Sequence, residues 1–173
     1  MNNCDFIFAR RSVRVFTGKP IARELLEKLL GAAMSAPSAM AKDPWRFIVV
    51  EDRERLAAVA EGLPNGKFLP RAAAGIIVCG DLEQAHGGEL SYLLQDCSAA
   101  MENLLLAAAA EGLGACWLGV HPREDRIVHL RRLFSLPPRI LPLGVAAVGY
   151  PAETPPPRNR FVASSVTWDT PER

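Results

Sequence analysis

The sequence predicts an α+β fold in which helices flank a central mixed sheet of four to five strands. The first observation is that segments with helical spacing alternate with short segments rich in β-branched residues. The second is size, because 173 residues, 49% of them apolar, suit one compact domain over residues 1–173 and exclude disorder. The third is a long helix, expected from residue 89 or 90 to 111, that is apolar on nearly every face.

The predicted helices rest on spacing and on end signals. Leucines recur at helical spacing within residues 22–33, and Pro37 in the following loop disfavours a helical residue before it. Gly112 favours the left-handed cap that ends the long helix. Pro122 is expected to open the last helix, because proline is favoured in a first turn. Helices are therefore predicted at residues 3–9, 22–33, 53–61 and 89–111 and from residue 122 onward.

The predicted strands are short and apolar. Residues 74–80 are nearly all apolar, as expected when both faces of a strand are covered. Strands are predicted at residues 46–51, 74–80, 116–120 and 141–148. After Tyr150, repeated prolines preclude a helix. We expect residues 151–173 to form an extended tail that packs on the body or on a partner subunit.

Charge and composition exclude several classes of function. The chain has 20 basic and 19 acidic residues, a formal charge of +1, and so lacks the broad basic field of a nucleic-acid-binding protein. The longest uninterrupted apolar run, residues 104–110, is far shorter than a bilayer span, and the N-terminus lacks a signal-peptide pattern. We expect a cytoplasmic protein without a nucleic-acid or membrane partner. The scattered cysteines and histidines predict no metal site.

The apolar central helix also predicts an oligomer. A helix that is apolar all round needs cover on every side, which one layer of so small a domain could hardly provide. A homodimer would provide it, and the alternative is a central helix within a monomer. The residues that carry this argument are Leu93, Leu94, Ala99, Met101, Leu104, Leu105, Leu106 and Ala107 to Ala110.

A basic cluster near the N-terminus is the first candidate for binding chemistry. Arg10, Arg11, Ser12 and Arg14 fall within five residues. Guanidinium groups match phosphate oxygens bidentately, and a serine hydroxyl adds a further donor. In an extended segment, Arg10, Ser12 and Arg14 share one face while Arg11 points away.

A second basic pair lies in the proline-rich tail, where Arg158 and Arg160 flank Asn159. The two clusters could converge on one phosphate, and the alternative is a pair of solvated surface patches. The glycines at residues 112–114 do not make a dinucleotide fingerprint, because they follow a helix instead of joining a strand to a helix. No nucleophile motif is present.

Several segments, taken in order, carry a specific resemblance. They are residues 10–16 (RRSVRVF), residues 36–47 (APSAMAKDPWRF), Asp96 with residues 102–108 (ENLLLAA), residues 112–119 (GLGACWLG), and residues 149–151 with Arg158 and Arg160. Together they resemble the FMN-dependent nitroreductase family over nearly the whole chain. No single segment is decisive, but all of them in register are.

The resemblance implies an FMN cofactor and a role for each basic residue. The residues implied to hold the FMN phosphate are Arg10, Ser12, Arg158 and Arg160, with Arg11 helping. Arg14 would lie near the flavin N1–O2 edge, where a cation stabilises the negative charge of reduced flavin.

Further positions follow from the same resemblance. Pro37, Ser38 and Ala39 would approach the flavin from the partner subunit. The backbone amides around Leu118 and Gly119 would face flavin N5. Asn65 and Lys67 lie near the point where the family often contributes an amide and a lysine to the pyrimidine end.

The chain departs from the family pattern in one loop. Ala41, a position expected near the cofactor, replaces the usual asparagine, and Asp43 replaces the usual glutamine. A carboxylate at Asp43 disfavours a nearby anionic flavin unless Lys42 or Arg46 neutralises it or it faces solvent. The chain is also short, so the inserted helices that often roof the substrate pocket are expected to be absent.

The resemblance implies a homodimeric oxidoreductase. It would pass hydride from NAD(P)H through flavin N5 to a nitroaromatic, quinone or similar acceptor by a ping-pong mechanism. No catalytic side chain is predicted, because the flavin performs the chemistry. Three alternatives remain open: a flavin store or sensor without turnover, another flavin reaction on the same scaffold (dehydrogenase, dehalogenase or flavin destructase), and an anion-binding module without flavin.

Overall fold

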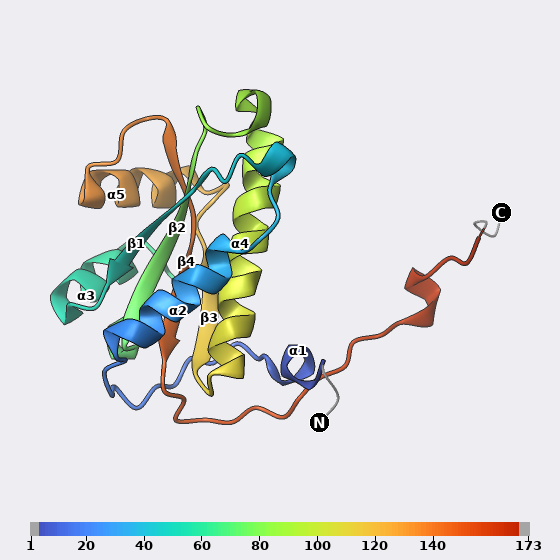
Figure 1. The fold of residues 1–173 in the computed structure, drawn as a ribbon. Coiled ribbons are helices and arrows are strands. Elements are labelled where there is room, and N and C mark those ends of the chain that lie inside the picture. The colour runs from blue at the N-terminus through green and yellow to red at the C-terminus, as the bar shows by residue number, and fades with distance from the viewer. Residues whose placement is uncertain (1–3, 170–173) are drawn as a thin grey trace.

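The computed structural model describes residues 4–169, so Asn3 of the first predicted helix and residues 170–173 of the tail lie outside it. The predicted α+β class is confirmed, and Figure 1 shows a four-stranded sheet with helices packed on it. The elements are α1 (Asp5–Ala9), α2 (Arg23–Met34), β1 (Trp45–Val50), α3 (Arg53–Glu61), β2 (Ala74–Asp81), α4 (Leu90–Ala110), β3 (Gly114–Gly119), α5 (Glu124–Phe134) and β4 (Ile140–Gly149).

The strands lie in the order β1-β2-β4-β3, and all three ladders between them are antiparallel. The predicted mixed sheet is therefore wrong, since among residues 4–169 a parallel pairing occurs only at an isolated bridge between Ser12 and Ala115. This bridge brings the N-terminal segment to the outer edge of β3. The edge strand is thereby covered by the segment that carries the basic cluster.

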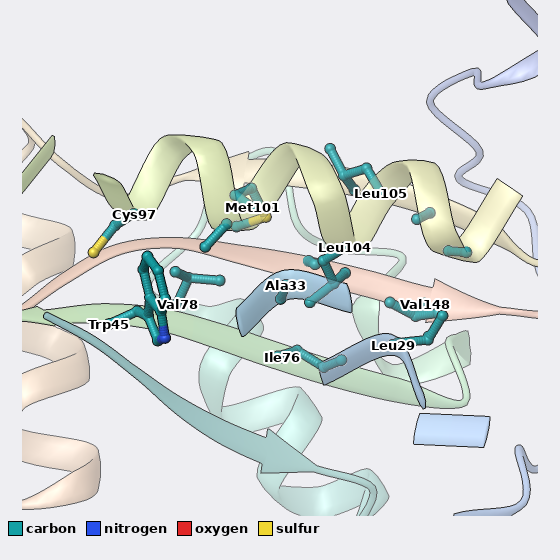
Figure 2. Close-up of a cluster of buried hydrophobic side chains, with 14 of the residues drawn as sticks. Leu29, Ala33, Trp45, Ile76, Val78, Cys97, Met101, Leu104, Leu105 and Val148 are labelled. Atoms are coloured by element: carbon teal, nitrogen blue, oxygen red, sulfur yellow. The ribbon is translucent and has the colours of Figure 1, made fainter. Parts of the chain in front are cut away.

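Alternating side chains of the central strands divide the core into two layers. Ile76 and Val78 of β2 face α2 and α4, whereas Ile77 and Cys79 face α3 and α5. Both sets are fully buried, as expected for a sheet covered on both faces. Figure 2 shows the first layer, in which Leu29 and Ala33 of α2 meet Met101 and Leu104 of α4 over Ile76 and Val148.

Helix ends follow local chemistry in most places. Asp52 caps α3 by accepting a hydrogen bond from the Arg55 amide at 2.9 Å. Gly112 has φ +72°. Its amide donates to the Ala109 carbonyl, and the Leu113 amide donates to the Ala108 carbonyl, which are the two hydrogen bonds of a Schellman cap. The predicted cap at Gly112 is confirmed.

The predicted start of the last helix is wrong. Pro122 does not open α5, which begins at Glu124 with Arg123 as its N-cap residue. Residues 120–123 form a turn, closed by the Arg123 amide donating to the Val120 carbonyl at 2.9 Å. Pro122 therefore lies in this turn, and the helix begins after it.

Helix α4 is buried on one face only within a single chain. Leu93, Met101 and Leu104 are fully buried against the sheet and α2. Leu106 is half-buried and belongs to neither hydrophobic core, and Tyr92 near the N-terminal end is exposed. Helix α1 covers part of this outer face (Figure 1).

The tail has two parts. Residues 151–158 run along the N-terminal segment, where the Ala152 amide donates to the Val15 carbonyl at 2.9 Å and the Arg158 amide to the Phe8 carbonyl at 3.0 Å. Residues 159–169 are exposed throughout and lead away from the body (Figure 1), with one 3₁₀ turn at Ala163–Ser165. Over residues 4–169, none of the helices has the length and apolar character needed to cross a membrane.

Candidate functional site

The N-terminal basic segment is held against the outer edge of β3. The Val13 amide donates to the Ala115 carbonyl at 3.0 Å. Gly114 permits this close approach, because a Cβ there would lie 2.7 Å from a methyl carbon of Val13. The cluster is therefore anchored beside the strand that ends at Leu118 and Gly119.

The first cavity beside this segment, called here the basic pocket, has a volume of about 380 Å³. It is lined by Ile7, Phe8, Arg10, Arg11, Ser12, Arg14, Arg158 and Arg160. The two arginine clusters from opposite ends of the chain therefore share one cavity. A concave surface with five guanidinium groups and a hydroxyl is suited to a phosphate dianion.

Contacts within the chain hold this pocket together. The Arg11 guanidinium donates to the Pro156 carbonyl of the tail, and Arg11 lines both the basic pocket and a further cavity beside residues 151–155. Arg10 forms an ion pair with Glu102 of α4, with 3.2 Å between Nε and Oε1. The ion pair orients Arg10 and leaves the other guanidinium nitrogens able to donate. The tail thus supplies the hydrogen-bond partner of Arg11.

The second cavity, called here the strand-end pocket, has a volume of about 440 Å³. Its lining residues are Arg14, Leu63, Asn65, Cys116, Trp117, Leu118, Gly119 and Arg126. Arg14 lines both pockets, so the two adjoin. At Gly119 a Cβ would meet no atom within 4 Å, which leaves the backbone open to a flat ligand.

The strand-end pocket holds few titratable groups. Burial raises the pKa of Cys116, and the nearby Arg14 cation and Ser12 hydroxyl offset part of this. The remaining titratable side chains of the lining are the two arginines. The pocket thus carries positive charge but no carboxylate or histidine that could exchange protons near neutral pH.

The loop at residues 37–43 lines neither pocket of its own chain. It packs on α4 instead, where the Ala39 amide donates to Oδ1 of Asp96 at 2.9 Å. Met40, Ala41 and Asp43 have φ of 53°, 52° and 48°, in the left-handed region that non-glycine residues rarely adopt. A loop with three such residues needs hydrogen bonds that hold its backbone in this conformation.

Asp43 provides such a restraint. Ser38 Oγ donates to Asp43 Oδ1 at 2.5 Å and accepts from the Asp43 amide at 3.0 Å. The replacement of the usual glutamine therefore closes the loop. Asp43 is exposed, and Arg46 pairs with the buried Asp81 (3.7 Å between Nη2 and Oδ2) and not with Asp43.

Two buried thiols lie in the core, Cys79 on β2 and Cys97 on α4. Burial raises the pKa of Cys79 and of Cys97 to about 12. Cys97 Sγ donates to the Cys79 carbonyl at 3.5 Å. Such thiols stay protonated at neutral pH and behave as small apolar groups. Among residues 4–169, no cluster of three or more His, Cys, Asp or Glu could hold a metal ion.

The structure thus brings most of the predicted residues to two adjoining cavities. Lys67 is exposed and lines neither of them, so its assignment stays a prediction. Sequence reasoning missed Arg126 and Trp117. Arg126 belongs to a helix with a mixed-charge surface, and its spacing gives no sign that it faces a cavity. Trp117 alternates outward on β3, and only the strand order shows that it lies beside the strand-end pocket.

Comparison with known proteins shows the family of the chain. The profile of the Nitroreductase family matches residues 7–66 and 57–150. A Methanothermobacter thermautotrophicus protein named as a candidate NADH dehydrogenase/NAD(P)H nitroreductase is 45% identical over 163 residues, which cover 93% of this chain and 83% of that protein.

Solved structures show the same fold. An FMN-dependent nitroreductase from Clostridium difficile R20291 superposes with a TM-score of 0.88 at 27% identity, covering 96% of this chain and 98% of that chain. A candidate nitroreductase from Desulfovibrio desulfuricans, solved in complex with FMN, has a TM-score of 0.82 at 30% identity, covering 96% of each chain. The chain belongs to the nitroreductase family.

Proposed function

We propose that this chain is an NAD(P)H-dependent oxidoreductase that holds FMN across the basic pocket and the strand-end pocket. The observation that carries the proposal is that Arg14 joins a pocket suited to phosphate with a pocket of apolar walls and an open strand end. Relatives with matching folds are named as FMN-dependent or were solved with FMN, which supports the same cofactor here.

The residues present fit FMN. The phosphate would be held by Arg10, Arg11, Ser12, Arg158 and Arg160, which line the basic pocket. Each guanidinium–phosphate hydrogen bond is charge-assisted and stronger than a neutral one. A short phosphate tail that ends here also agrees with the absence of a dinucleotide fingerprint from the sequence.

The strand-end pocket would hold the flavin ring. Arg14 and Asn65 supply polar contacts, and Leu63 and Trp117 supply apolar walls. The backbone at Leu118 and Gly119 would face the reacting edge, since Gly119 presents no side chain. When bound, FMN supplies two-electron transfer between a nicotinamide and an acceptor.

The protein orients its ligands and exchanges no protons through the described lining of this pocket. Donor and acceptor would use the same open site in turn, which is a ping-pong scheme. A nitroaromatic, quinone or similar flat acceptor suits the open pocket, because no inserted helix roofs it among residues 4–169. The proposed chemistry needs only soluble partners and agrees with the expected cytoplasmic location.

We also propose a homodimer in which each FMN contacts both subunits. Leu106 on α4 and Phe6, Ile7 and Phe8 of α1 leave apolar surface on one side of the chain. The described tail ends in exposed apolar residues, Trp168 with 81% of its surface accessible, and a partner would cover such groups. Pro37, Ser38, Ala39 and Ala41 line neither pocket of their own chain, which supports a contact with the partner's cofactor.

The visible spectrum of the purified protein tests the cofactor. We expect a yellow protein from which heat releases FMN and not FAD. A colourless protein that takes up no added FMN would overturn the proposal. Steady-state oxidation of NADH or NADPH with a quinone then separates an oxidoreductase from a flavin store or sensor, which would show no turnover.

A further inference from the structure

The strand-end pocket is lined by a second arginine, Arg126, which belongs to neither basic cluster. Arg126 lies in the first turn of α5, and its side chain lines the pocket together with Arg14. Its Nη1 donates to the Gly119 carbonyl at 2.6 Å. This bond ties the side chain to the end of β3, beside the backbone that faces the pocket.

One donor of Arg126 has no partner within the chain. The Nε atom is buried and makes no hydrogen bond to any of residues 4–169. A buried N–H left without an acceptor is destabilising, and more so on a charged group. Contacts among residues 4–169 therefore satisfy the Arg126 guanidinium only in part.

The charge of Arg126 is also not balanced by a carboxylate. Across the part of the chain that the structure describes, no Asp or Glu oxygen lies within 4.0 Å of its guanidinium. Arg10, Arg46 and Arg139 by contrast pair with Glu102 or Asp81. The strand-end pocket therefore holds two cations and no anion among its lining residues.

We propose that Arg126 is a second cation for the ring held in this pocket, where it stabilises the reduced, anionic cofactor more than the oxidised, neutral one. This inference rests on the proposed function. A fixed positive charge interacts with a negative ring far more than with a neutral ring. Arg126 thus helps to set the reduction potential, and its bond to Gly119 fixes the position of the charge.

A purely structural role makes a different prediction. If Arg126 served only to hold the Gly119 carbonyl, a neutral donor of similar reach would replace it. Arg126→Gln keeps an N–H donor and removes the charge, whereas Arg126→Lys keeps the charge and removes the planar fork. Arg132→Gln is the matched control, because Arg132 is exposed on the same helix and lines neither pocket.

The test measures the dissociation constant of oxidised FMN by fluorescence and the midpoint potential of the bound cofactor by dye equilibration. For Arg126→Gln we expect the affinity for reduced FMN, relative to oxidised FMN, to fall by about tenfold, and the potential to fall accordingly. Arg126→Lys is expected to retain most of the potential, and Arg132→Gln all of it. Arg126→Met serves as a second neutral variant if the glutamine variant does not fold.

Several outcomes would overturn the inference. A neutral variant that keeps the wild-type potential would mean that Arg126 acts only as a structural donor. An unchanged potential with a raised KM for a carboxylate-bearing acceptor would mean that Arg126 contacts the substrate. A wild-type protein that takes up no FMN would refute the proposed function itself, and this result is recognised before any variant is made.

Discussion

The two adjoining pockets are built in opposite ways. The basic pocket is formed by segments from the two ends of the chain, with long side chains that are partly or fully exposed. The strand-end pocket is formed mainly by the end of the edge strand β3 and the first turn of α5, with Arg14 and the loop after α3 completing its lining. Gly119 and Arg126 sit on this rigid frame, whereas Arg158 and Arg160 depend on how the tail lies.

This difference separates affinity from electronic tuning. Charges on the exposed segments attract and hold a phosphate, which keeps the same charge in both redox states of the cofactor. Charges fixed at the strand end face the ring, whose charge changes on reduction. Arg14 lines both pockets and connects the two functions.

The largest expected effect comes from disrupting the proposed homodimer, on which we expect FMN binding in both pockets to depend. Leu106→Glu places a charge on the outer face of α4, where we propose that a second chain packs. We expect this variant to be a monomer by light scattering and to lose its FMN. Val128→Glu is the control, because Val128 is 52% exposed on α5 and should tolerate the change. A Leu106→Glu protein that remains a flavin-loaded dimer would contradict the proposed interface.

The next largest effect is expected in the basic pocket. Arg10→Ala or Arg160→Ala should each weaken FMN binding about tenfold to a hundredfold, because each removes a charge-assisted hydrogen bond to phosphate. The midpoint potential should change little. Titration of FMN into each apoprotein measures the affinity, with Arg132→Ala as the control. Wild-type affinity in both variants would mean that these arginines are solvated surface groups.

A smaller effect on affinity, with a distinct effect on potential, is expected for Arg14. Arg14→Ala should still bind oxidised FMN appreciably, but its midpoint potential should fall and its reduction by the nicotinamide should slow. Potentiometry and stopped-flow absorbance measure these two quantities. If Arg10→Ala shifts the potential and Arg14→Ala does not, the assignment of the cations to the two pockets is reversed.

The smallest predicted effect concerns the buried core that supports both pockets. Burial raises the pKa of Cys79 and of Cys97 from 9.0 to about 12, so the folded protein holds protons that the unfolded chain loses. This contribution to stability is complete below pH 9 and is lost as the pH rises toward 12, by about 1 kcal/mol per thiol at pH 10. Urea unfolding at pH 8 and pH 10 measures the loss. Cys79→Ala should reduce the difference between the two pH values, and an unchanged difference would exclude this linkage.

Local patterns in the sequence determined most of the elements. Helix α3 has the predicted bounds 53–61, and the predicted cap at Gly112 is confirmed by its positive φ. These features depend on residue spacing and on backbone preferences within a few residues, which a sequence displays directly. The two arginine clusters were visible for the same reason, as were the segments that resemble the nitroreductase family.

Only the tertiary structure decided what these elements form together. The strand order β1-β2-β4-β3 places the N-terminal segment on the edge of β3 and so joins the two pockets. The tail supplies the acceptor for the Arg11 guanidinium, and the Gly119 carbonyl holds Arg126 at the strand end. The role of Asp43 in closing its loop was equally hidden, because it depends on three left-handed residues. Contacts between distant segments arise from packing of the whole chain, and no local period or cap encodes them.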